Sequence, residues 1–184
     1  MKLFIPLILG TAREGRHTEH AARFIYEEIL KLSDVDTEFL DVRDFRILAT
    51  DKTEHTALEQ KFSALITRAD GLIIVTPEYN HGYPGELKMM LDMAYDEYAK
   101  KPIALVGTGG GMGGARAIEQ LRSVVIELSA IPIQEAIYFP NVYHLFDESG
   151  ALKDPAPYRE RIRAMCDQLL WYARVLKKGR EIGV

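Results

Sequence analysis

The chain has 184 residues, of which 47% are hydrophobic and 27% are charged, and its formal net charge is −4 at pH 7. This composition is typical of a globular protein, and the length predicts a single domain spanning residues 1–184. A protein that binds nucleic acid needs a basic face, so we expect no nucleic-acid partner. The one cysteine, Cys166, excludes an intrachain disulfide and a multi-cysteine metal site.

Neither a targeting signal nor a membrane span is evident. Residues 3–9 are apolar, but only Lys2 precedes them as a charge and no convincing cleavage site follows. No stretch approaches the roughly 18 apolar residues that a membrane-spanning helix requires. His17 and His20 have no carboxylate cluster beside them, so we expect no metal site. The sequence therefore predicts a cytoplasmic protein without a membrane partner.

Five apolar runs divide the chain and are the candidate strands. They are residues 3–9, 37–42, 72–75, 103–106 and 131–138. Continuous rather than alternating apolar runs are typical of a parallel sheet that is covered on both faces. Pro6 and Pro132 make the strand boundaries less certain, because proline cannot donate a hydrogen bond to a neighbouring strand.

Between these runs, apolar residues recur at helical spacing. The candidate helices cover residues 21–32, 58–66, 87–94, 118–128 and 162–176, and residues 141–157 form the longest expected loop. The alternation predicts an α/β fold, a three-layer sandwich with a five-stranded parallel sheet. Five strands suit the flavodoxin-like order 2-1-3-4-5 better than a six-stranded dinucleotide fold.

Ligands of such sheets bind beyond the carboxyl ends of the strands, so the loop after the first strand is a candidate site. In residues 10–18, Thr11 and Thr18 supply hydroxyl groups, and Arg13 and Arg16 supply guanidinium groups suited to phosphate oxygens. The helix that follows offers free N–H groups at its N-terminus. The alternative is a polar turn with a solvated arginine pair and Thr18 as a helix cap.

The loop after the third strand, residues 76–85, is rich in groups that can face a flat heteroaromatic ligand. The Tyr79 ring, the Asn80 amide and several backbone N–H groups can read a ring edge that carries both donors and acceptors. The alternative is a rigid turn in which Tyr79 and Tyr83 cap the core.

The loop after the fourth strand, residues 107–114, contains six glycines in eight residues. Glycine costs up to ~1 kcal/mol relative to alanine in regular structure, so a simple surface turn would not need so many. Close approach of the backbone to a planar ligand would need this many glycines. The first strand-to-helix turn lacks Gly-x-Gly-x-x-Gly, which argues against a dinucleotide-binding fold.

The chain resembles the NADPH-dependent FMN reductase family, a flavodoxin-like group that includes quinone, azo-dye and chromate reductases. The resemblance rests mainly on residues 77–80 followed by 82–88, and on the glycine-rich residues 108–114. Thr11-x-Arg13 is its weakest part, and the likeness extends from Leu3 to about Leu176. The family commonly has serine at the position of Gly82.

The resemblance implies bound FMN, with NADPH or NADH as hydride donor and a quinone, azo compound or flavin as acceptor. It implies no obligatory catalytic side chain. Arg16 either adds a phosphate contact or faces solvent. The implied cofactor-binding residues are Thr11, Arg13, Arg16 and Thr18 for the phosphate, Pro77, Glu78, Tyr79 and Asn80 for the isoalloxazine, and Thr108, Gly109, Gly110 and Gly111 beneath the ring.

The third candidate helix is apolar on more than one side. Met89 and Met93 lie on a different side from Leu91, and Tyr95 and Tyr98 extend that side. An apolar face outside the core favours an oligomer interface, so we expect a homodimer or homotetramer through this helix.

Two alternatives to a reductase remain open. One is a flavodoxin-type electron-transfer carrier without nicotinamide activity. Such carriers are usually strongly acidic, and the net charge of −4 supports this only weakly. The other is a flavodoxin-like scaffold or sensor that has lost its cofactor.

Overall fold

Five parallel strands form the central sheet of the computed structural model, which describes residues 2–47 and 56–183. In spatial order the strands are β4 (Phe39–Asp41), β2 (Leu7–Leu9), β5 (Leu72–Pro77), β6 (Pro102–Thr108) and β7 (Ile131–Phe139). Numbered by the five apolar runs, this order is 2-1-3-4-5. The predicted flavodoxin-like sheet is therefore confirmed.

The two prolines of the apolar runs each mark an irregularity of the sheet. Residues 5–6 separate β2 from β1 (Leu3–Phe4), which pairs with β3 (Val35–Asp36). Pro6 still accepts a hydrogen bond from the Ile73 N–H at 3.0 Å, so the chain stays in register with β5. Pro132 lies on the edge strand β7, where the register with β6 shifts between Ile103 and Leu105. Proline is tolerated at both places because neither is a regular interior ladder position.

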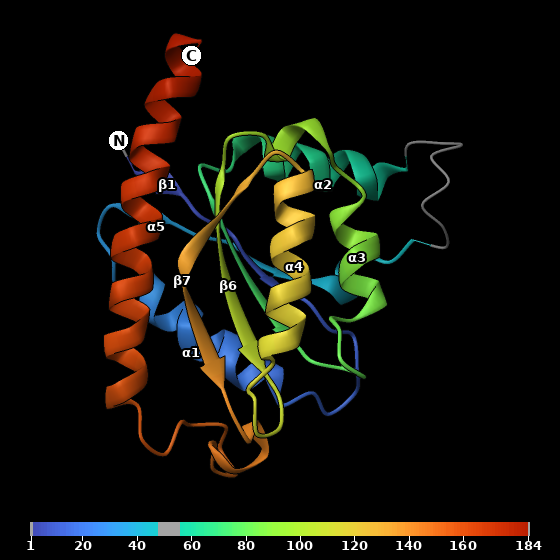
Figure 1. Cartoon of the computed structure of the whole chain (residues 1–184), viewed down its shortest axis with the longest axis vertical. Helices are drawn as coiled ribbons and strands as arrows, with labels where there is room; N and C mark the ends of the chain where they lie inside the picture. The colour runs from blue at the N-terminus through green and yellow to red at the C-terminus, as the bar shows by residue number, and fades with distance from the viewer. Residues whose placement is uncertain (1, 48–55, 184) are drawn as a thin grey trace.

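Helices cover both faces of this sheet (Figure 1). One face carries α1 (Thr18–Leu30) and α5 (Ala156–Ile182), and the other carries α2 (Ala57–Arg68), α3 (Gly85–Leu91) and α4 (Ala115–Glu127). Alternate residues of β5 enter the two cores, since Ile73 and Val75 face α1 and α5 whereas Ile74 faces the other layer. Each candidate helix expected from the sequence is present.

The third helix is shorter than expected, and this changes the interpretation of its apolar residues. The helix ends at Leu91, and the chain continues through a 3₁₀ turn at Asp96–Tyr98. Met93 and Tyr98 are buried within the chain, and the Tyr98 hydroxyl donates to the Leu91 carbonyl at 3.1 Å. The expectation that Met93 and Tyr98 extend an outer apolar side is therefore wrong, because helical spacing does not apply beyond Leu91. Tyr95 is 52% exposed.

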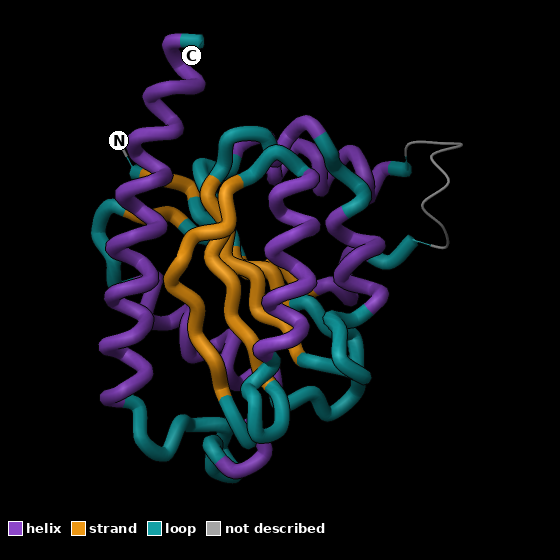
Figure 2. The backbone as a smooth tube through the Cα atoms, viewed as in Figure 1, coloured by secondary structure: helices purple, strands orange, loops and turns teal. Residues whose placement is uncertain are grey.

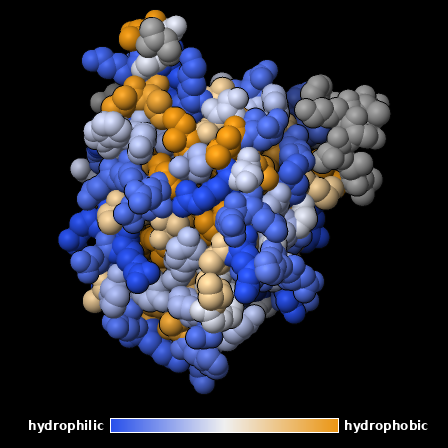
Figure 3. Space-filling model, in the orientation of Figure 1, coloured by the Kyte–Doolittle hydropathy of each residue, from blue (hydrophilic) through white to orange (hydrophobic). Residues whose placement is uncertain are grey.

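The loops that follow the strands gather at one edge of the sheet, called here the carboxyl edge (Figure 2, lower part of the view). Residues 140–155 run along this edge as the expected loop, with one 3₁₀ turn at Val142–His144. The surface is mainly hydrophilic in the view of Figure 3, with apolar side chains in its upper part. Within the described residues, no helix has the length and apolarity to cross a membrane.

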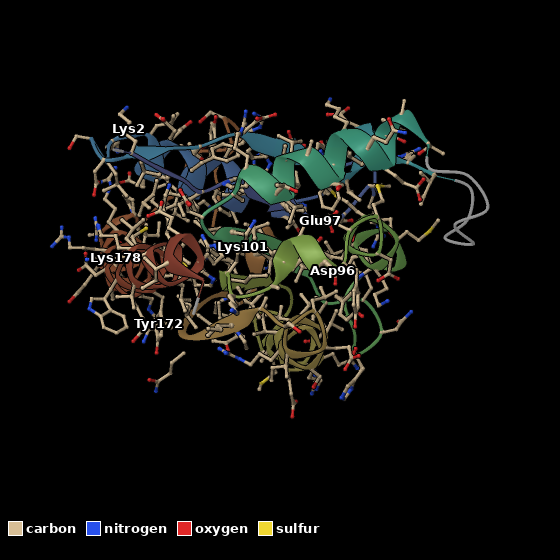
Figure 4. All side chains as sticks on the ribbon, turned by 90° about the horizontal axis from the view of Figure 1, so that it is seen from above. Lys2, Asp96, Glu97, Lys101, Tyr172 and Lys178 are labelled. Atoms are coloured by element: carbon tan, nitrogen blue, oxygen red, sulfur yellow. The ribbon has the colours of Figure 1, made fainter. Side chains whose placement is uncertain are left out.

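A buried lysine lies at the opposite edge, where the strands begin (Figure 4). The Lys101 ammonium donates to the carbonyl oxygens of Ile66 and Thr67, at 2.5 and 2.9 Å, and so caps the last turn of α2. Burial lowers the pKa of Lys101 to about 8, and the nearby charge of Arg180 acts in the same direction.

We expect Lys101→Met to remove a pH dependence of stability. The pKa of lysine in an unfolded chain is about 10.4, so the unfolded state binds more protons than the folded state between about pH 8 and 10.4. The free energy of unfolding contributed by Lys101 therefore rises with pH in this window, by about 2 kcal/mol from pH 8 to pH 10.

Urea denaturation of both proteins across this range measures the difference. Lys31→Met, at an exposed lysine paired with Glu28, is the matched control. The prediction would be contradicted if the difference in free energy of unfolding between the native chain and Lys101→Met stayed constant with pH.

Candidate functional site

Two adjoining pockets lie at the carboxyl edge. The larger, called here the central pocket, has a volume of about 230 Å³ and is lined by residues 13–18, 77–79, 108–109 and 142–143. The smaller, called the glycine recess, has a volume of about 180 Å³ and is lined by Glu78, residues 110–114 and Arg116. Glu78 lines both, so the three candidate loops meet around a continuous surface.

The structure brings most of the candidate cofactor-binding residues to these two pockets. Gly110 and Gly111 line the glycine recess, whereas Thr11 and Asn80 line neither pocket. Thr11 is a buried residue near the start of the first loop, and Asn80 is exposed at the tip of a turn. The other candidates line the central pocket: Arg13, Arg16, Thr18, Pro77, Glu78, Tyr79, Thr108 and Gly109.

A buried pair of hydroxyl groups joins the first and third loops. Thr18 Oγ1 lies 2.8 Å from Thr108 Oγ1, and both residues are buried. Thr18 is the first residue of α1, and His17 occupies the cap position without a side-chain capping bond. The alternative of Thr18 as the helix cap is therefore wrong. Its hydroxyl instead fixes the start of α1 against the end of β6.

The second loop is a tight turn that is tied to the first loop. Tyr79 and Gly82 exchange two backbone hydrogen bonds, at 2.8 and 3.1 Å, and Asn80 and His81 between them have positive φ angles of 49° and 75°. Asparagine tolerates this left-handed conformation, so the turn itself accounts for Asn80. The Tyr79 hydroxyl lies 3.0 Å from Thr11 Oγ1. Tyr79 therefore contacts the first loop, whereas Tyr83 packs against the core as the alternative expects.

Glu78 connects the second loop to the start of α4. Its carboxylate accepts from the Arg116 guanidinium at 2.9 Å and from the Arg116 backbone N–H at 3.2 Å. An acidic group is favourable at a helix N-terminus, where the backbone N–H groups lack partners. The Glu78 N–H donates to the Thr108 carbonyl at 3.0 Å. Glu78 thus holds the wall that the two pockets share.

The glycines of the third loop fall into two classes. A Cβ atom on Gly107 would lie 2.6 Å from the Gly113 carbonyl oxygen, and one on Gly114, whose φ is 87°, would lie 2.7 Å from the Thr108 nitrogen. The chain's own packing therefore requires glycine at these positions. Gly110 and Gly111 differ, because a Cβ atom would meet nothing within 4 Å and neither φ is positive. Glycine there leaves room for a group that approaches from outside.

Arg16 is buried among carboxylates. Its guanidinium binds Asp41 and lies 3.1 Å from the Glu19 carboxylate, and it also donates to the Thr11 carbonyl. Burial disfavours these charges, but the ion pairs outweigh it, so the pKa of Arg16 is raised and the pKa values of Asp41 and Glu19 are lowered. The alternative of a solvent-facing Arg16 is therefore wrong. Its charge is matched within the chain.

Arg13, in contrast, is exposed beside the central pocket. Its guanidinium lies 5.6 Å from the centre of the Tyr79 ring. In the part of the chain that the structure describes, it makes no ion pair. The backbone N–H groups of Glu14 and Gly15 make no hydrogen bond among the same residues. The mouth of the pocket thus offers a positive charge and free donors to an anion.

Sequence reasoning missed Val142 and Tyr143, the two lining residues of the central pocket that lie outside the three candidate loops. The Tyr143 ring is 61% exposed and meets the His17 ring edge-on, with centroids 5.1 Å apart. The loop that carries Tyr143 also supports the third loop, since the Val142 N–H donates to the Gly109 carbonyl at 3.0 Å. The rule that ligands bind beyond the strand ends, applied to the fifth strand as well, would have included this loop.

The site offers no sign of metal or thiol chemistry in the residues that the structure describes. No group of three or more histidine, cysteine, aspartate or glutamate side chains there is placed to hold a metal ion. Cys166 is buried on α5, and burial raises the pKa of its thiol to about 12. A thiol of this kind stays protonated at neutral pH, so Cys166 is a packing residue.

We expect the Thr18 and Thr108 hydroxyls to be energetically coupled. Thr18→Val leaves the buried Thr108 hydroxyl unpaired and should lower the free energy of unfolding by about 1–2 kcal/mol. Adding Thr108→Val removes both hydroxyls, so the double variant should lose about 1 kcal/mol less than the sum of the single losses.

Urea denaturation without added flavin measures this cycle. Thr67→Val, at an exposed threonine of α2, is the control and should have little effect. If the loss of unfolding free energy in the double variant equalled the sum of the two single losses, the hydroxyls would be independent.

The sequence matches a family model and several known proteins. The model of the NADPH-dependent FMN reductase family matches residues 3–144. A 2-hydroxy-1,4-benzoquinone reductase of a Burkholderia species is 32% identical over 156 residues, covering 81% of this chain and 82% of that protein. An FMN-dependent NADPH-azoreductase of Staphylococcus aureus is 30% identical over 174 residues, covering 89% of this chain and 92% of that protein.

The fold comparison gives a similar result. The flavoenzyme FerB of Paracoccus denitrificans, an NAD(P)H:acceptor oxidoreductase, superposes with a TM-score of 0.77 over 92% of this chain and 98% of that chain. Its sequence identity is 17%, so this likeness supports the fold alone. On the match of the family model and the two curated relatives, the chain belongs to the NADPH-dependent FMN reductase family.

Proposed function

We propose that this chain is an FMN-dependent NAD(P)H oxidoreductase. It transfers hydride from NADPH or NADH, by way of bound FMN, to a small acceptor such as a quinone, an azo compound or a flavin. Residues 1–184 form one FMN-binding domain in this proposal. The observation that carries it is the pair Gly110 and Gly111, which no contact within the described chain requires to be glycine, in a member of a flavin reductase family.

The central pocket suits the phosphate end of FMN. Arg13 supplies a guanidinium that makes no ion pair among the described residues, and Glu14 and Gly15 supply free N–H groups from the turn before α1. The positive end of the α1 dipole, at the helix N-terminus beyond this turn, also favours an anion. In this proposal Thr18 contributes through its hydroxyl, whereas Thr11 acts from below by holding the Tyr79 hydroxyl.

The glycine recess and the wall beside it suit the flat ring system. Pro77, Glu78 and Tyr79 form that wall, and Gly109 continues it toward Gly110 and Gly111. The N–H groups of Gly110 and Gly111 make no hydrogen bond among the described residues, so they are available as donors. Asn80, at the exposed tip of its turn, is placed to contact a molecule that arrives from solvent.

Bound FMN supplies the hydride chemistry, and the chain supplies binding and orientation. The loops hold the ring in one place so that donor and acceptor can approach its open face in turn. The free N–H groups of the third loop favour negative charge on a ring edge beside them. No side chain of the site needs to act as an acid or a base. Tyr79 and Tyr83 are candidates for contact with the acceptor.

The alternative of an electron-transfer carrier is not favoured. The matching family model is that of a reductase, and the curated relatives are named as reductases of FMN, a benzoquinone and azo compounds. Steady oxidation of NAD(P)H in the presence of a quinone is expected of a reductase and not of a carrier, so this measurement distinguishes the two classes of protein.

We also propose a cytoplasmic homodimer or homotetramer. Of the residues first expected at the interface, the half-buried Met89 and the exposed Tyr95 are available on the outer side of α3 and the turn after it. Continuity with the second loop supports this surface, because Tyr83 lies in that loop and α3 follows it directly. Analytical ultracentrifugation of the native chain and of Met89→Glu measures the assembly.

The decisive experiment is purification followed by a visible spectrum and identification of the released cofactor. Turnover is then measured with NADPH and NADH against a quinone and an azo dye. Flavin absorbance, stoichiometric FMN and steady acceptor-dependent oxidation are the expected results. A colourless protein that FMN does not stabilise against heat would overturn the proposal and favour a scaffold without cofactor.

We expect Gly110→Leu to weaken FMN binding without loss of stability. A Cβ atom at this position meets nothing within 4 Å and the φ angle of Gly110 is not positive, so the melting temperature without flavin should stay nearly unchanged. The same side chain would occupy the glycine recess and should raise the Kd for FMN by at least tenfold, or about 1.4 kcal/mol. Fluorescence titration with FMN measures this change.

Gly85→Leu is the matched control, since Gly85 also has open space around it and lies outside both pockets. Equal Kd values for Gly110→Leu and this control would show that the recess does not hold the cofactor.

A further inference from the structure

We infer that Arg43, which lies outside the three candidate loops, is a positioning residue that orients the first loop for binding of the FMN phosphate. This inference rests on the proposed function. Its starting point is that three consecutive carbonyl oxygens of the first loop are each held by a guanidinium group. Arg16 donates to the Thr11 carbonyl, and Arg43 donates to the Ala12 carbonyl from Nε at 3.1 Å and to the Arg13 carbonyl from Nη2 at 2.6 Å.

The sheet register places these two arginines at the loop. Asp41, the last residue of β4, pairs with Leu9 at the end of β2, so it lies beside the start of the first loop. One oxygen of the Asp41 carboxylate accepts from the Arg16 guanidinium at 2.8 Å and from the Arg43 backbone N–H at 2.9 Å. Asp41 therefore links the Arg16 guanidinium to the backbone of Arg43, and the two arginines together form a clamp on the first loop. Its pKa is lowered because these bonds outweigh the effect of burial, so the carboxylate stays charged at neutral pH.

Holding the carbonyl groups also decides where the loop N–H groups point. In a trans peptide the C=O and the following N–H point in opposite directions. The bond from Arg43 to the Arg13 carbonyl therefore turns the Glu14 N–H away from Arg43. Arg13, Glu14 and Gly15 all line the central pocket, and the N–H groups of Glu14 and Gly15 have no partner among the described residues. Arg43 thus leaves the Glu14 N–H free on the side of the central pocket, where the FMN phosphate would bind.

The clamp has a second consequence for the Ala12 peptide. Its N–H donates to the Glu86 carboxylate at 3.0 Å, on the side opposite the Thr11 carbonyl that Arg16 holds. The loop is therefore fixed from both sides before a ligand arrives. A preorganised loop binds its ligand without the entropic cost of ordering. Because Arg43 acts on backbone and lines neither pocket, its effect is exerted through the loop.

The test compares FMN with riboflavin, which has the same ring and ribityl chain but no phosphate. The full-length chain, freed of flavin by dialysis, is titrated with each compound. We expect Arg43→Gln to raise the Kd for FMN by about tenfold, because the variant loses one or two charge-assisted hydrogen bonds that order the loop. The Kd for riboflavin should change less than twofold, and Arg43→Lys should recover part of the FMN affinity.

Arg68→Gln is the matched control. It removes the same charge from an exposed arginine that pairs with Glu38 at the other end of the sheet, and it should leave both Kd values unchanged. Melting temperatures without flavin report on the fold and should agree among the variants within about 2 °C.

Three outcomes would overturn the inference. They are an unchanged FMN Kd in Arg43→Gln, an equal loss of FMN and riboflavin affinity, and an equal effect of Arg68→Gln. Failure of the native chain to bind either flavin is a separate result, because it would overturn the proposed function itself.

Discussion

The parallel pairing of β2 with β4 and β5 decides where every loop of the site lies. In this register Leu9 pairs with Asp41 on one side and with Val75 on the other. The chain therefore leaves the sheet at the same level in three places, which are the first loop, the second loop and the turn that follows Asp41. Pairing of Pro77 with Thr108 places the third loop beside them. Three segments far apart in the sequence therefore meet because their strands end together, and a slip by one residue would also turn each side chain to the opposite face.

Side chains then join these loops to one another. The contacts are Thr18 with Thr108 between the first and third loops, Thr11 with Tyr79 between the first and second, and Glu78 with Arg116 between the second loop and α4. Each is made inside the chain and none needs a ligand. Such a framework can carry its binding groups in place at a low entropic cost of binding. The same framework explains why several predicted ligand-binding side chains are engaged with the protein itself, while backbone N–H groups remain free.

The apolar pattern of the sequence was sufficient for the sheet and the five helices, because burial on both faces leaves a continuous apolar signal. The strand order followed from the number of strands, since five suit the flavodoxin-like order. It failed after Leu91, where the chain leaves the helix and the spacing of Met93 and Tyr98 loses its meaning. The burial of Arg16 was also missed. Glu19 is a local partner three residues away, but Asp41 comes from another strand, and only the sheet register brings it near. Contacts of that kind cannot be read from spacing along the chain.

Gly82 shows how a departure from a family pattern can be explained by the rest of the chain. A Cβ atom there would lie 2.8 Å from Gln120 Oε1, and the Gln120 amide donates to the His81 carbonyl at 3.0 Å. The end of the Gln120 side chain of α4 thus lies where the Cβ atom of a serine at position 82 would be, so a serine there requires this flexible side chain to shift, and Gln120 holds the same turn from outside. Gly107 and Gly114 have a similar explanation in contacts with backbone. Gly110 and Gly111 have none within the described residues, and this contrast separates glycines that the fold requires from glycines that the proposed FMN ring would require.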